Sequence, residues 1–450
     1  MCRARHASSP RIPQFVEGPP RLALWASRWL LPFDAGGSFC GMALRKIEAG
    51  RLDADLTAVA GVRDDGPGWT RRVFSEPDRA GRALVAQLMS GAGLETTIDA
   101  VGNVIGRLAG TSGARAALVT GSHTDTVPGG GRFDGVIGVI GAIEAVRALR
   151  EQGVRLRHDL VVVDFLGEEP NDQGMSCVGS RALAGTLLPE HLGLTDDGGE
   201  TLAAAIRRGG GDPEAALGLA WSPGEVHRYY ELHIEQGPHL ERLGRPIGVV
   251  DAIVGIRRFR TRFSGRADHA GTMPMSLRHD AGLAAAESAL AVESLADGEN
   301  VATTGWVELA PGATNVVPAS ALMSSECRST SLGWLEAFQG RYAAEVEQIS
   351  ARRQVEGSVS WLTLEPPTPM DAEASRAITL AAGRLGLAVE RLASYAGHDA
   401  VQMAHLGPCA MVFVPSRGGR SHTPDEWTDL DQVTLGVQTL VETLVIADES

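Results

Sequence analysis

The chain has 450 residues, 44% of them hydrophobic, and is therefore long enough for two domains or for one domain with a large insertion. Its 41 lysines and arginines are outnumbered by 55 aspartates and glutamates, and the net charge of −14 argues against a nucleic-acid-binding protein. Five scattered cysteines indicate free thiols in the cytoplasm, and no unbroken apolar run is long enough to span a membrane.

Residues 1–41 differ in composition from the rest of the chain, since they mix arginine, proline and tryptophan without periodicity. Arg28 interrupts the apolar stretch between Leu22 and Phe33, which argues against a signal peptide. We expect either a disordered extension or a misassigned start, with Met42 as the true first residue.

The segment 117–149 carries the first chemical signal. A short apolar strand breaks at Gly121, a turn of three glycines follows, and apolar residues then recur at helical spacing. His123, Asp125 and Asp134 therefore lie between the end of a strand and the start of a helix, where open α/β sheets bind ligands. One imidazole and two carboxylates suit a divalent metal ion such as zinc or manganese, although Asp134 is equally suited to cap the helix.

The clearest buried strand, 160–166, is followed by the pair Glu168 and Glu169. One of these carboxylates is a candidate metal ligand, and its neighbour is a candidate for proton transfer. The alternative is a pair of solvated loop charges. Two later strands also lead to histidines, because His233 closes one strand and His422 follows another in a glycine-rich loop.

Strands alternate with helices through this part of the chain, which predicts an α/β fold with a mainly parallel sheet and helices on both faces. Residues 247–364 have a different order of elements, β-α-β-β-α-β, which is typical of a ferredoxin-like unit. We expect this unit, in which Asp280 begins a helix, to be an insertion between the two segments of one catalytic, metal-binding domain, 42–246 and 365–450.

The candidate residues all lie beyond the carboxyl ends of predicted core strands, where they can meet. Three histidines and several carboxylates in this arrangement fit a centre with two metal ions bridged by one carboxylate. A water held between two such ions gives up a proton readily, and a nearby carboxylate can pass that proton to a leaving nitrogen. The set is His123, Asp134, Glu168, Glu169, His233 and His422.

Five motifs carry a resemblance to a known family. They are Gly121-Ser-His-Thr-Asp-Thr-Val-Pro128, Gly130-Gly-Arg-Phe-Asp-Gly135, His233-Ile-Glu-Gln-Gly-Pro238, Ala267-Asp-His-Ala-Gly-Thr272 and Gly397-His-Asp-Ala400. On these motifs the chain resembles the N-carbamoyl-L-amino-acid hydrolases, a group that also includes β-ureidopropionases and allantoate amidohydrolases, among the aminoacylase-like two-metal peptidases. The resemblance extends from Met42 to the C-terminus.

The resemblance implies the fold of the two-metal exopeptidases and two divalent metal ions per subunit. It implies that His123 and His233 hold one ion, that Glu169 and His422 hold the other, and that Asp134 bridges them. Zinc is the ion we expect, with manganese and cobalt as alternatives.

The resemblance also implies that Asp125 orients His123 and that Glu168 is the general base and acid. Many members of the family continue Glu-Glu-Gly at this point, whereas Pro170 and Asn171 follow the two glutamates in this chain. The two carboxylates remain, so we expect the metal site to be kept and the loop after it to differ.

Four further residues match family positions that grip the substrate, namely Gln236, His269, Asn315 and Arg328. We expect Arg328 to pair with the substrate carboxylate, and His269 and Asn315 to polarise the scissile carbonyl or to position its polar groups. In the family the insertion forms the dimer contact and closes over the site, so some of these residues are expected to act on the partner subunit's site. The family's Asp-x-Arg is here Glu326-Cys327-Arg328.

The sequence therefore predicts a cytoplasmic, homodimeric amidohydrolase that cleaves the carbamoyl C–N bond of a small molecule, an N-carbamoyl-L-amino acid. Two alternatives stay open: the same chemistry on allantoate or N-carbamoyl-β-alanine, and hydrolysis of an N-acyl amino acid or a small peptide. A third alternative is a metal-free binding or scaffold protein, against which the intact ligand residues and Glu168 argue. No nucleic acid and no membrane is expected as a partner.

Overall fold

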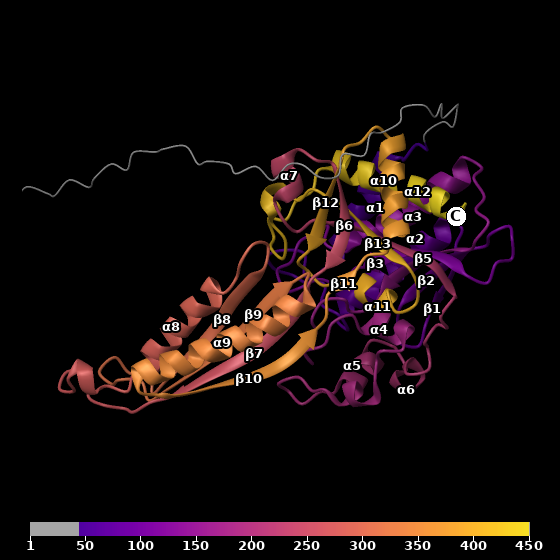
Figure 1. Ribbon diagram of the computed structural model, residues 1–450. Helices are drawn as coiled ribbons and strands as arrows, with labels where there is room; N and C mark the ends of the chain where they lie inside the picture. Colours follow the sequence, from indigo (N-terminus) through magenta and orange to yellow (C-terminus); the bar gives the residue numbers. More distant parts are fainter. Residues whose placement is uncertain (1–44, 450) are drawn as a thin grey trace, which may run out of the picture. The chain divides into compact units, whose positions relative to one another are not determined.

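The computed structural model describes residues 45–449 (Figure 1), and the expectation for residues 1–41 lies outside this range. The larger sheet contains β1 (Glu95–Ile98), β2 (Val104–Leu108), β3 (Ala117–His123), β4 (Leu160–Phe165), β5 (Val226–Ile234), β6 (Ile247–Ile253), β11 (Thr368–Pro369), β12 (Val389–Ser394) and β13 (Cys409–Val414). The smaller sheet contains β7 (Gly255–Ser264), β8 (Val301–Ala310), β9 (Ser320–Ser329) and β10 (Glu356–Glu365). The α-helices are α1 (Ala49–Gly61), α2 (Glu76–Gly91), α3 (Val136–Glu151), α4 (Val178–Ala184), α5 (Leu202–Arg208), α6 (Pro213–Ala216), α7 (His239–Leu243), α8 (Ala281–Ser294), α9 (Leu332–Arg353), α10 (Ala372–Arg384), α11 (Ala400–Met403) and α12 (Leu430–Asp448).

The larger sheet has nine strands in the order β1-β2-β4-β3-β5-β13-β6-β11, and β12 pairs with β6. The neighbouring strands β4, β3, β5 and β13 in its middle run parallel. Antiparallel pairs join β1, β2 and β4 on one side, and β13, β6 and β11 on the other. The expected α/β class is confirmed, and the sheet is mixed, with its parallel strands in the middle.

Both faces of the larger sheet are buried under helices. Along β13, Ala410, Val412 and Val414 face the core formed with α3, α10 and α12, whereas Met411 and Phe413 face the core formed with α4 and α11. This alternation is the two-residue repeat of an extended strand. Because both faces are buried, β4 and β13 are almost entirely apolar. Every residue of β3 is buried as well, although the second half of this strand is polar.

The smaller sheet has the order β10-β7-β9-β8, and all of its neighbouring strands are antiparallel. The chain order β7–α8–β8–β9–α9–β10 is the ferredoxin-like order that the sequence predicts. Helices α8 and α9 pack on one face, where Phe259, Met323 and Phe338 are fully buried. Asp280 caps α8 as expected, since its carboxylate accepts the backbone N–H of Gly282 at 2.9 Å.

The boundary between the two sheets differs from the expectation. The insertion is expected to begin at residue 247, but β6 begins there and pairs with β12 and β13 in the larger sheet. The strands of the smaller sheet begin at Gly255 and end at Glu365. Short apolar strands look alike in sequence, and only the pairing of β6 assigns it to the larger sheet.

Helix α12 is apolar enough, by length and composition, to cross a membrane, with a mean hydropathy of 1.2 over its best window. In the described structure 61% of that window is buried. Val437, Leu440 and Leu444 pack in the same core as α3 and α10, which accounts for the apolar composition of this helix.

Candidate metal centre

The parallel strands in the middle of the larger sheet bring ligand-type side chains to one edge. β3 ends at His123, β5 ends one residue after His233, and Glu168 and Glu169 follow the end of β4. β3 lies between β4 and β5, so the carboxyl ends of the three strands are adjacent. All four side chains are buried.

Asp134 lies at the centre of this group and divides its two carboxylate oxygens between two sets of partners. Its Oδ1 lies 3.1 Å from Nε2 of His233 and 3.9 Å from Nε2 of His123. Its Oδ2 lies 3.2 Å from Nε2 of His422, which lies 3.3 Å from Oε1 of Glu169. The five residues thus form two groups of three donors that share Asp134, and the donor atoms of each group lie within 4.8 Å of one another.

The alternative role of Asp134 as a helix cap is not observed. Its carboxylate accepts hydrogen bonds from Nε2 of Gln236 and Oγ of Ser421, both at 2.9 Å, and Gly135 is the residue that precedes α3. Gly135 has a φ of 66°, and a Cβ there would overlap the imidazole of His123. Glycine at this position lets the chain enter α3 directly beside the imidazole.

His422 reaches Asp134 from the loop after β13, and its backbone has a φ of 54°. Gln236, on the other side of the same carboxylate, has a φ of 59°. Left-handed backbone is uncommon for residues other than glycine and concentrates at functional sites, because the surrounding structure must compensate for its cost. Both loops therefore hold these side chains against Asp134 at the cost of a less favourable backbone conformation.

The charges at the site are strongly coupled. Burial acts to raise the pKa of the Asp134 carboxyl, but hydrogen bonds from His233 and His422 outweigh burial and hold the pKa well below its usual value. Hydrogen bonds to Asp134 and Glu169 raise the pKa of His422 to about 10. Buried carboxylates thus draw positive charge onto the neighbouring imidazoles, and a divalent cation offers the same compensation.

The orientation of the imidazoles also fits divalent metal ions. Nδ1 of His123 lies 3.1 Å from the backbone carbonyl of Asp125, and Nδ1 of His233 lies 2.9 Å from the carbonyl of Ile234. A proton on Nδ1 satisfies these carbonyls and leaves Nε2 as the ligand atom, as is usual for metal-bound imidazoles. In His233 this Nε2 also accepts the backbone N–H of Gly135 at 3.1 Å. The residues present therefore fit a pair of divalent ions.

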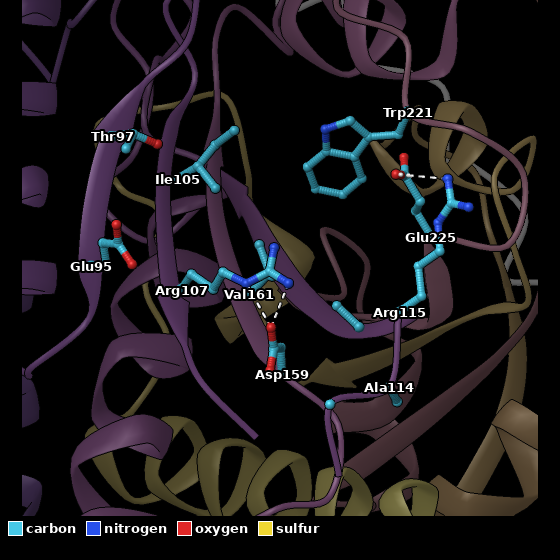
Figure 2. A pocket seen from close by; sticks show the side chains of 12 residues that line it. Glu95, Thr97, Ile105, Arg107, Ala114, Arg115, Asp159, Val161, Trp221 and Glu225 are labelled. Carbon is cyan, nitrogen blue, oxygen red and sulfur yellow. Dashed lines mark hydrogen bonds and ion pairs between the residues drawn. The ribbon is translucent and has the colours of Figure 1, made fainter. Parts of the chain in front are cut away.

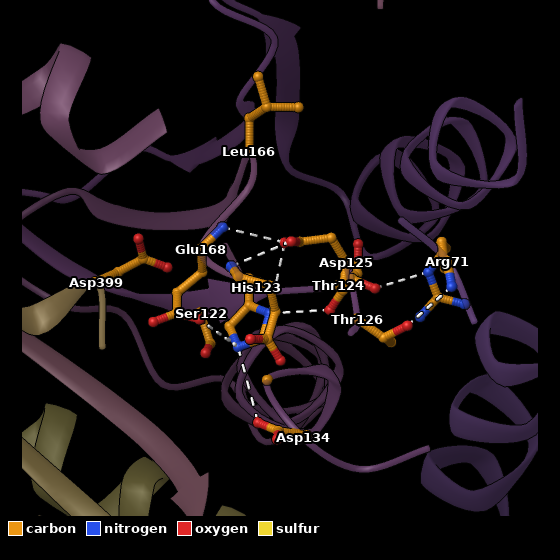
Figure 3. A network of polar contacts seen from close by, with 12 residues as sticks. Arg71, Ser122, His123, Thr124, Asp125, Thr126, Asp134, Leu166, Glu168 and Asp399 are labelled. Atoms are coloured by element: carbon orange, nitrogen blue, oxygen red, sulfur yellow. Dashed lines mark hydrogen bonds and ion pairs between the residues drawn. The ribbon is translucent and has the colours of Figure 1, made fainter. Parts of the chain in front are cut away.

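Asp125 connects His123 to the turn that carries the two glutamates (Figure 3). Its Oδ1 lies 3.5 Å from Nδ1 of His123. Its two carboxylate oxygens accept the backbone N–H groups of Glu168 and Glu169, each at 3.2 Å. The sequence predicts the first contact, but nothing in it indicates the second, in which one buried carboxylate fixes the backbone of both glutamates.

Glu168 is buried beside the two groups of donors. Its Oε2 lies 3.6 Å from Nε2 of His123, and its Oε1 lies 3.8 Å from the thiol sulfur of Cys177. Burial raises the pKa of Glu168 well above its usual value, and the neighbouring carboxylates of Glu169 and Asp399 add to this effect. A buried carboxyl group whose pKa is shifted by its surroundings is a candidate for proton transfer.

The known proteins that this chain resembles agree with the geometry. Residues 119–445 match the family described as peptidase family M20/M25/M40. The chain belongs to this family. It is 36% identical over 417 residues, 90% of this chain and 100% of the relative, to an N-carbamoyl-L-amino-acid amidohydrolase of Paenarthrobacter aurescens. It is 37% identical over 428 residues, 92% of this chain and 90% of the relative, to a ureidoglycolate hydrolase of Arabidopsis thaliana.

The solved structures that this chain resembles agree with its assignment to the family. A hydantoinase/carbamoylase family amidase from Burkholderia multivorans matches it with a TM-score of 0.83 at 31% identity, over 90% of this chain and 99% of that chain. The expected family resemblance is therefore confirmed.

Two of the expected substrate-binding residues, Gln236 and Arg328, form hydrogen bonds with residues in the loops around the larger sheet. Gln236 bonds to Asp134, as described above. Arg328 donates through Nε to Oε1 of Glu326 at 2.7 Å, and its Nη1 donates to the backbone carbonyl of Tyr395. Arg328, Glu326 and Tyr395 line a cavity of about 300 Å³.

The other two expected substrate-binding residues, His269 and Asn315, are exposed. The backbone N–H of Ala270 donates to the carbonyl of Asn315 at 2.9 Å, so their two loops are adjacent. Within residues 45–449, no hydrogen bond or ion pair joins either side chain to the residues around Asp134.

Three residues that contribute to the site are not indicated by the sequence. The buried Arg71 donates to the carbonyl of Thr124 at 2.7 Å, and Ser421 donates to Asp134. Glu426 accepts the backbone N–H of Asp134 at 3.0 Å. Each of these residues lies in a loop and bonds to a group that is distant in the chain, so no sequence periodicity predicts it. The one feature visible in the sequence is that Glu426 follows the candidate ligand His422 by four residues.

A larger cavity, of about 680 Å³, lies at the other end of the parallel strands (Figure 2). Asp159, which precedes β4, and Trp221 line it, and its charges are paired: Arg107 bonds to Asp159, and Arg115 lies 3.5 Å from Glu225. It contains none of the predicted site residues.

Proposed function

We propose that this M20 protein cleaves the carbamoyl C–N bond of an N-carbamoyl-L-amino acid and releases carbon dioxide, ammonia and the free amino acid. The observation that carries the proposal is that two groups of imidazole and carboxylate donors meet at the two carboxylate oxygens of Asp134, beside the buried Glu168. The relative from Paenarthrobacter aurescens is named for this activity.

In the proposal His123 and His233 would hold one divalent ion, Glu169 and His422 would hold the other, and Asp134 would be shared by both. When bound, the ions polarise the scissile carbonyl and lower the pKa of the attacking water. We favour zinc, and manganese and cobalt accept the same nitrogen and oxygen donors.

Glu168 moves the proton in this reaction. Its carboxylate takes a proton from the attacking water as the new C–O bond forms, and gives it to the leaving nitrogen as the C–N bond breaks. The raised pKa of the buried carboxyl suits a group that must act first as a base and then as an acid. Asp125 holds the turn that presents this side chain.

The remaining contacts bind the substrate. Arg328 lines the cavity of about 300 Å³, and we propose that its guanidinium, which also bonds to Glu326 and Tyr395, pairs with the substrate carboxylate. Gln236 donates to Asp134, and we propose that it also contacts the carbamoyl group. His269 accepts the backbone N–H of Gly271 through Nδ1 at 3.0 Å, which leaves Nε2 as a donor for the scissile carbonyl, with Asn315 on the adjacent loop.

A second candidate substrate class is the ureido acids, such as allantoate and ureidoglycolate. The Arabidopsis thaliana relative, named a ureidoglycolate hydrolase, is as similar to this chain as the carbamoyl amino acid hydrolase is. These substrates and N-carbamoyl-β-alanine share a carbamoyl nitrogen near a carboxylate, so the same residues serve all of them. N-acyl amino acids share only the carboxylate and the amide.

The protein is also proposed to act in the cytoplasm as a homodimer, with the smaller sheet and its two helices, residues 255–365, as lid and dimerisation domain. Strand β8 is at the edge of its sheet, and α8 packs beside it. Leu290 of α8 is 65% exposed, and Trp306 and Val307 of β8 are each 46% exposed. An open strand edge beside exposed apolar side chains favours pairing with a second copy of the same surface.

The experiment that tests the proposed function is a substrate panel on the full-length protein, stripped of metal and reloaded in turn with zinc, manganese or cobalt. The panel contains N-carbamoyl-L-amino acids with different side chains, N-carbamoyl-β-alanine, allantoate, ureidoglycolate and N-acetyl amino acids. We expect the highest kcat/KM on an N-carbamoyl-L-amino acid, and only after metal is restored. Preference for allantoate or ureidoglycolate would support the second class, and full activity in the stripped protein would exclude the metal centre.

A further inference from the structure

Glu426 lies at the junction of the two loops that supply Asp134 and His422. Its side chain is buried, with 2% of the residue exposed, and the family resemblance assigns it no role. We propose that Glu426 is a positioning residue, which fixes the backbone of Asp134 against the His422 loop and so sets the geometry in which both metal ions are bound. This inference rests on the metal centre of the proposed function.

The contact with the Asp134 segment is made through the backbone. One carboxylate oxygen of Glu426, Oε1, accepts the N–H groups of Phe133 at 2.9 Å and of Asp134 at 3.0 Å. Both donors immediately precede the turn into α3. Two bonds to a single carboxyl oxygen hold the peptide plane before Asp134, which determines where its carboxylate points.

The second oxygen of Glu426 faces the His422 loop. Its Oε2 lies 2.8 Å from Oγ of Ser421, and that hydroxyl lies 2.9 Å from Oδ2 of Asp134. Oδ2 is the oxygen that also faces His422. Glu426 therefore contacts Asp134 on both sides, directly through the backbone and through Ser421 at the side chain.

Gly131 provides the space for this carboxylate. A Cβ on Gly131 would overlap the carboxylate of Glu426, and the three atoms nearest to it all belong to that group. The φ of Gly131 is not in the left-handed region, so its backbone does not require glycine. Position 131 is therefore a glycine because the carboxylate of Glu426, which is far away in the sequence, occupies the space that a Cβ would need.

The test measures metal affinity in the full-length protein, by titration of the stripped protein with zinc against a competing chelator. We expect Glu426→Ala to weaken zinc binding by roughly 10- to 100-fold, the usual effect of removing a group that orients a ligand, with the larger loss in the ion held by His422. Glu426→Gln keeps an oxygen for the two backbone N–H groups, and its amide can donate to the Ser421 hydroxyl, which still donates to Asp134, so it should return the affinity to within about threefold of the original protein.

A double-mutant cycle with Gly131 separates the proposed contact from a general loss of structure. Gly131→Ala should reproduce the loss seen in Glu426→Ala, because the added methyl group displaces the carboxylate. The double variant should bind zinc no more weakly than Glu426→Ala alone, since the displaced group is already absent. Losses that add in full would show that the two residues act independently and would overturn the inference.

The matched control is Asp448, a buried carboxylate that accepts the backbone N–H groups of Arg157 at 2.7 Å and of His158 at 2.9 Å. Asp448→Ala should lower the unfolding temperature without changing zinc affinity. Zinc affinity unchanged in Glu426→Ala would overturn the inference while leaving the metal centre intact. Failure of the original protein to bind two zinc ions would instead overturn the proposed function.

Discussion

Oδ1 of Asp125 lies 3.5 Å from Nδ1 of His123, and the same carboxylate accepts the backbone N–H groups of Glu168 and Glu169. One buried side chain therefore links a proposed metal ligand to the turn that carries another ligand and the proposed general base. The geometry of the metal centre and that of the proton-transfer group are set by the same carboxylate.

Asp125→Asn tests this link. The amide keeps one acceptor oxygen, but its NH₂ group then faces a backbone N–H of Glu168 or Glu169, and two donors cannot bond to each other. We expect kcat to fall by roughly 10- to 100-fold. The measurement is steady-state kinetics with metal analysis of the purified variant, and a kcat equal to that of the original protein would exclude the linking role.

Glu168→Gln tests the proton-transfer role. The glutamine has the same shape and cannot exchange protons, so kcat should fall by roughly 10²- to 10⁴-fold while the metal content stays at two ions per subunit. Activity and metal analysis of the same preparation check both statements. Undiminished turnover in this variant would remove Glu168 from the mechanism.

Metal binding should depend on pH in a defined direction. Hydrogen bonds to Asp134 and Glu169 raise the pKa of His422 to about 10, so this imidazole is protonated at neutral pH in the metal-free protein. A protonated nitrogen cannot ligate, and binding must therefore release the proton. Apparent affinity should rise roughly tenfold per pH unit for each proton released, up to about pH 10.

Calorimetric titrations with zinc at pH 7, in buffers of different ionisation enthalpy, measure how many protons are released when the metal binds. His422→Ala serves as the comparison, because it removes one titrating ligand and should release fewer protons per ion. An observed enthalpy that is the same in all buffers would contradict the expected release.

Leu290→Glu tests the proposed dimer. Leu290 is 65% exposed on α8, beside the open edge strand β8, and a charge there should be excluded from an apolar interface. We expect the variant to sediment as a monomer at concentrations where the original protein is a dimer. The control is Leu380→Glu, a leucine that is 44% exposed on α10, which should leave sedimentation unchanged.

The sequence predicts the fold and the location of the site for one physical reason. Parallel strands buried on both faces are apolar runs that end abruptly, so polar residues such as His123 and Glu168 stand out where those runs stop. Helix caps such as Asp280 are local and are equally visible. The α/β class and the ferredoxin-like order of elements followed from these signals, whereas the family followed from the five motifs that the chain shares with it.

What the sequence does not indicate are contacts made through the backbone across long separations. Glu426 and Arg71 bond to peptide groups in other loops, and a peptide group has no sequence signature. For a related reason, the sequence predicts an insertion that begins one strand too early. The pairing of β6 depends on β12 and β13, which follow it by more than a hundred residues. Loops and long-range pairing are therefore where the structure adds most.

The wide separation of the residues around Asp134 has a consequence for biosynthesis. Phe133 and Glu426 are 293 positions apart, and His422 lies near the end of the chain. While the polypeptide is still being synthesised, the segments that precede the smaller sheet supply four of the five candidate ligands, and only His422 is missing. The second group of donors, Asp134, Glu169 and His422, is complete only after the last loop has been translated, so the proposed binding of a second ion would be a late step in the maturation of the protein.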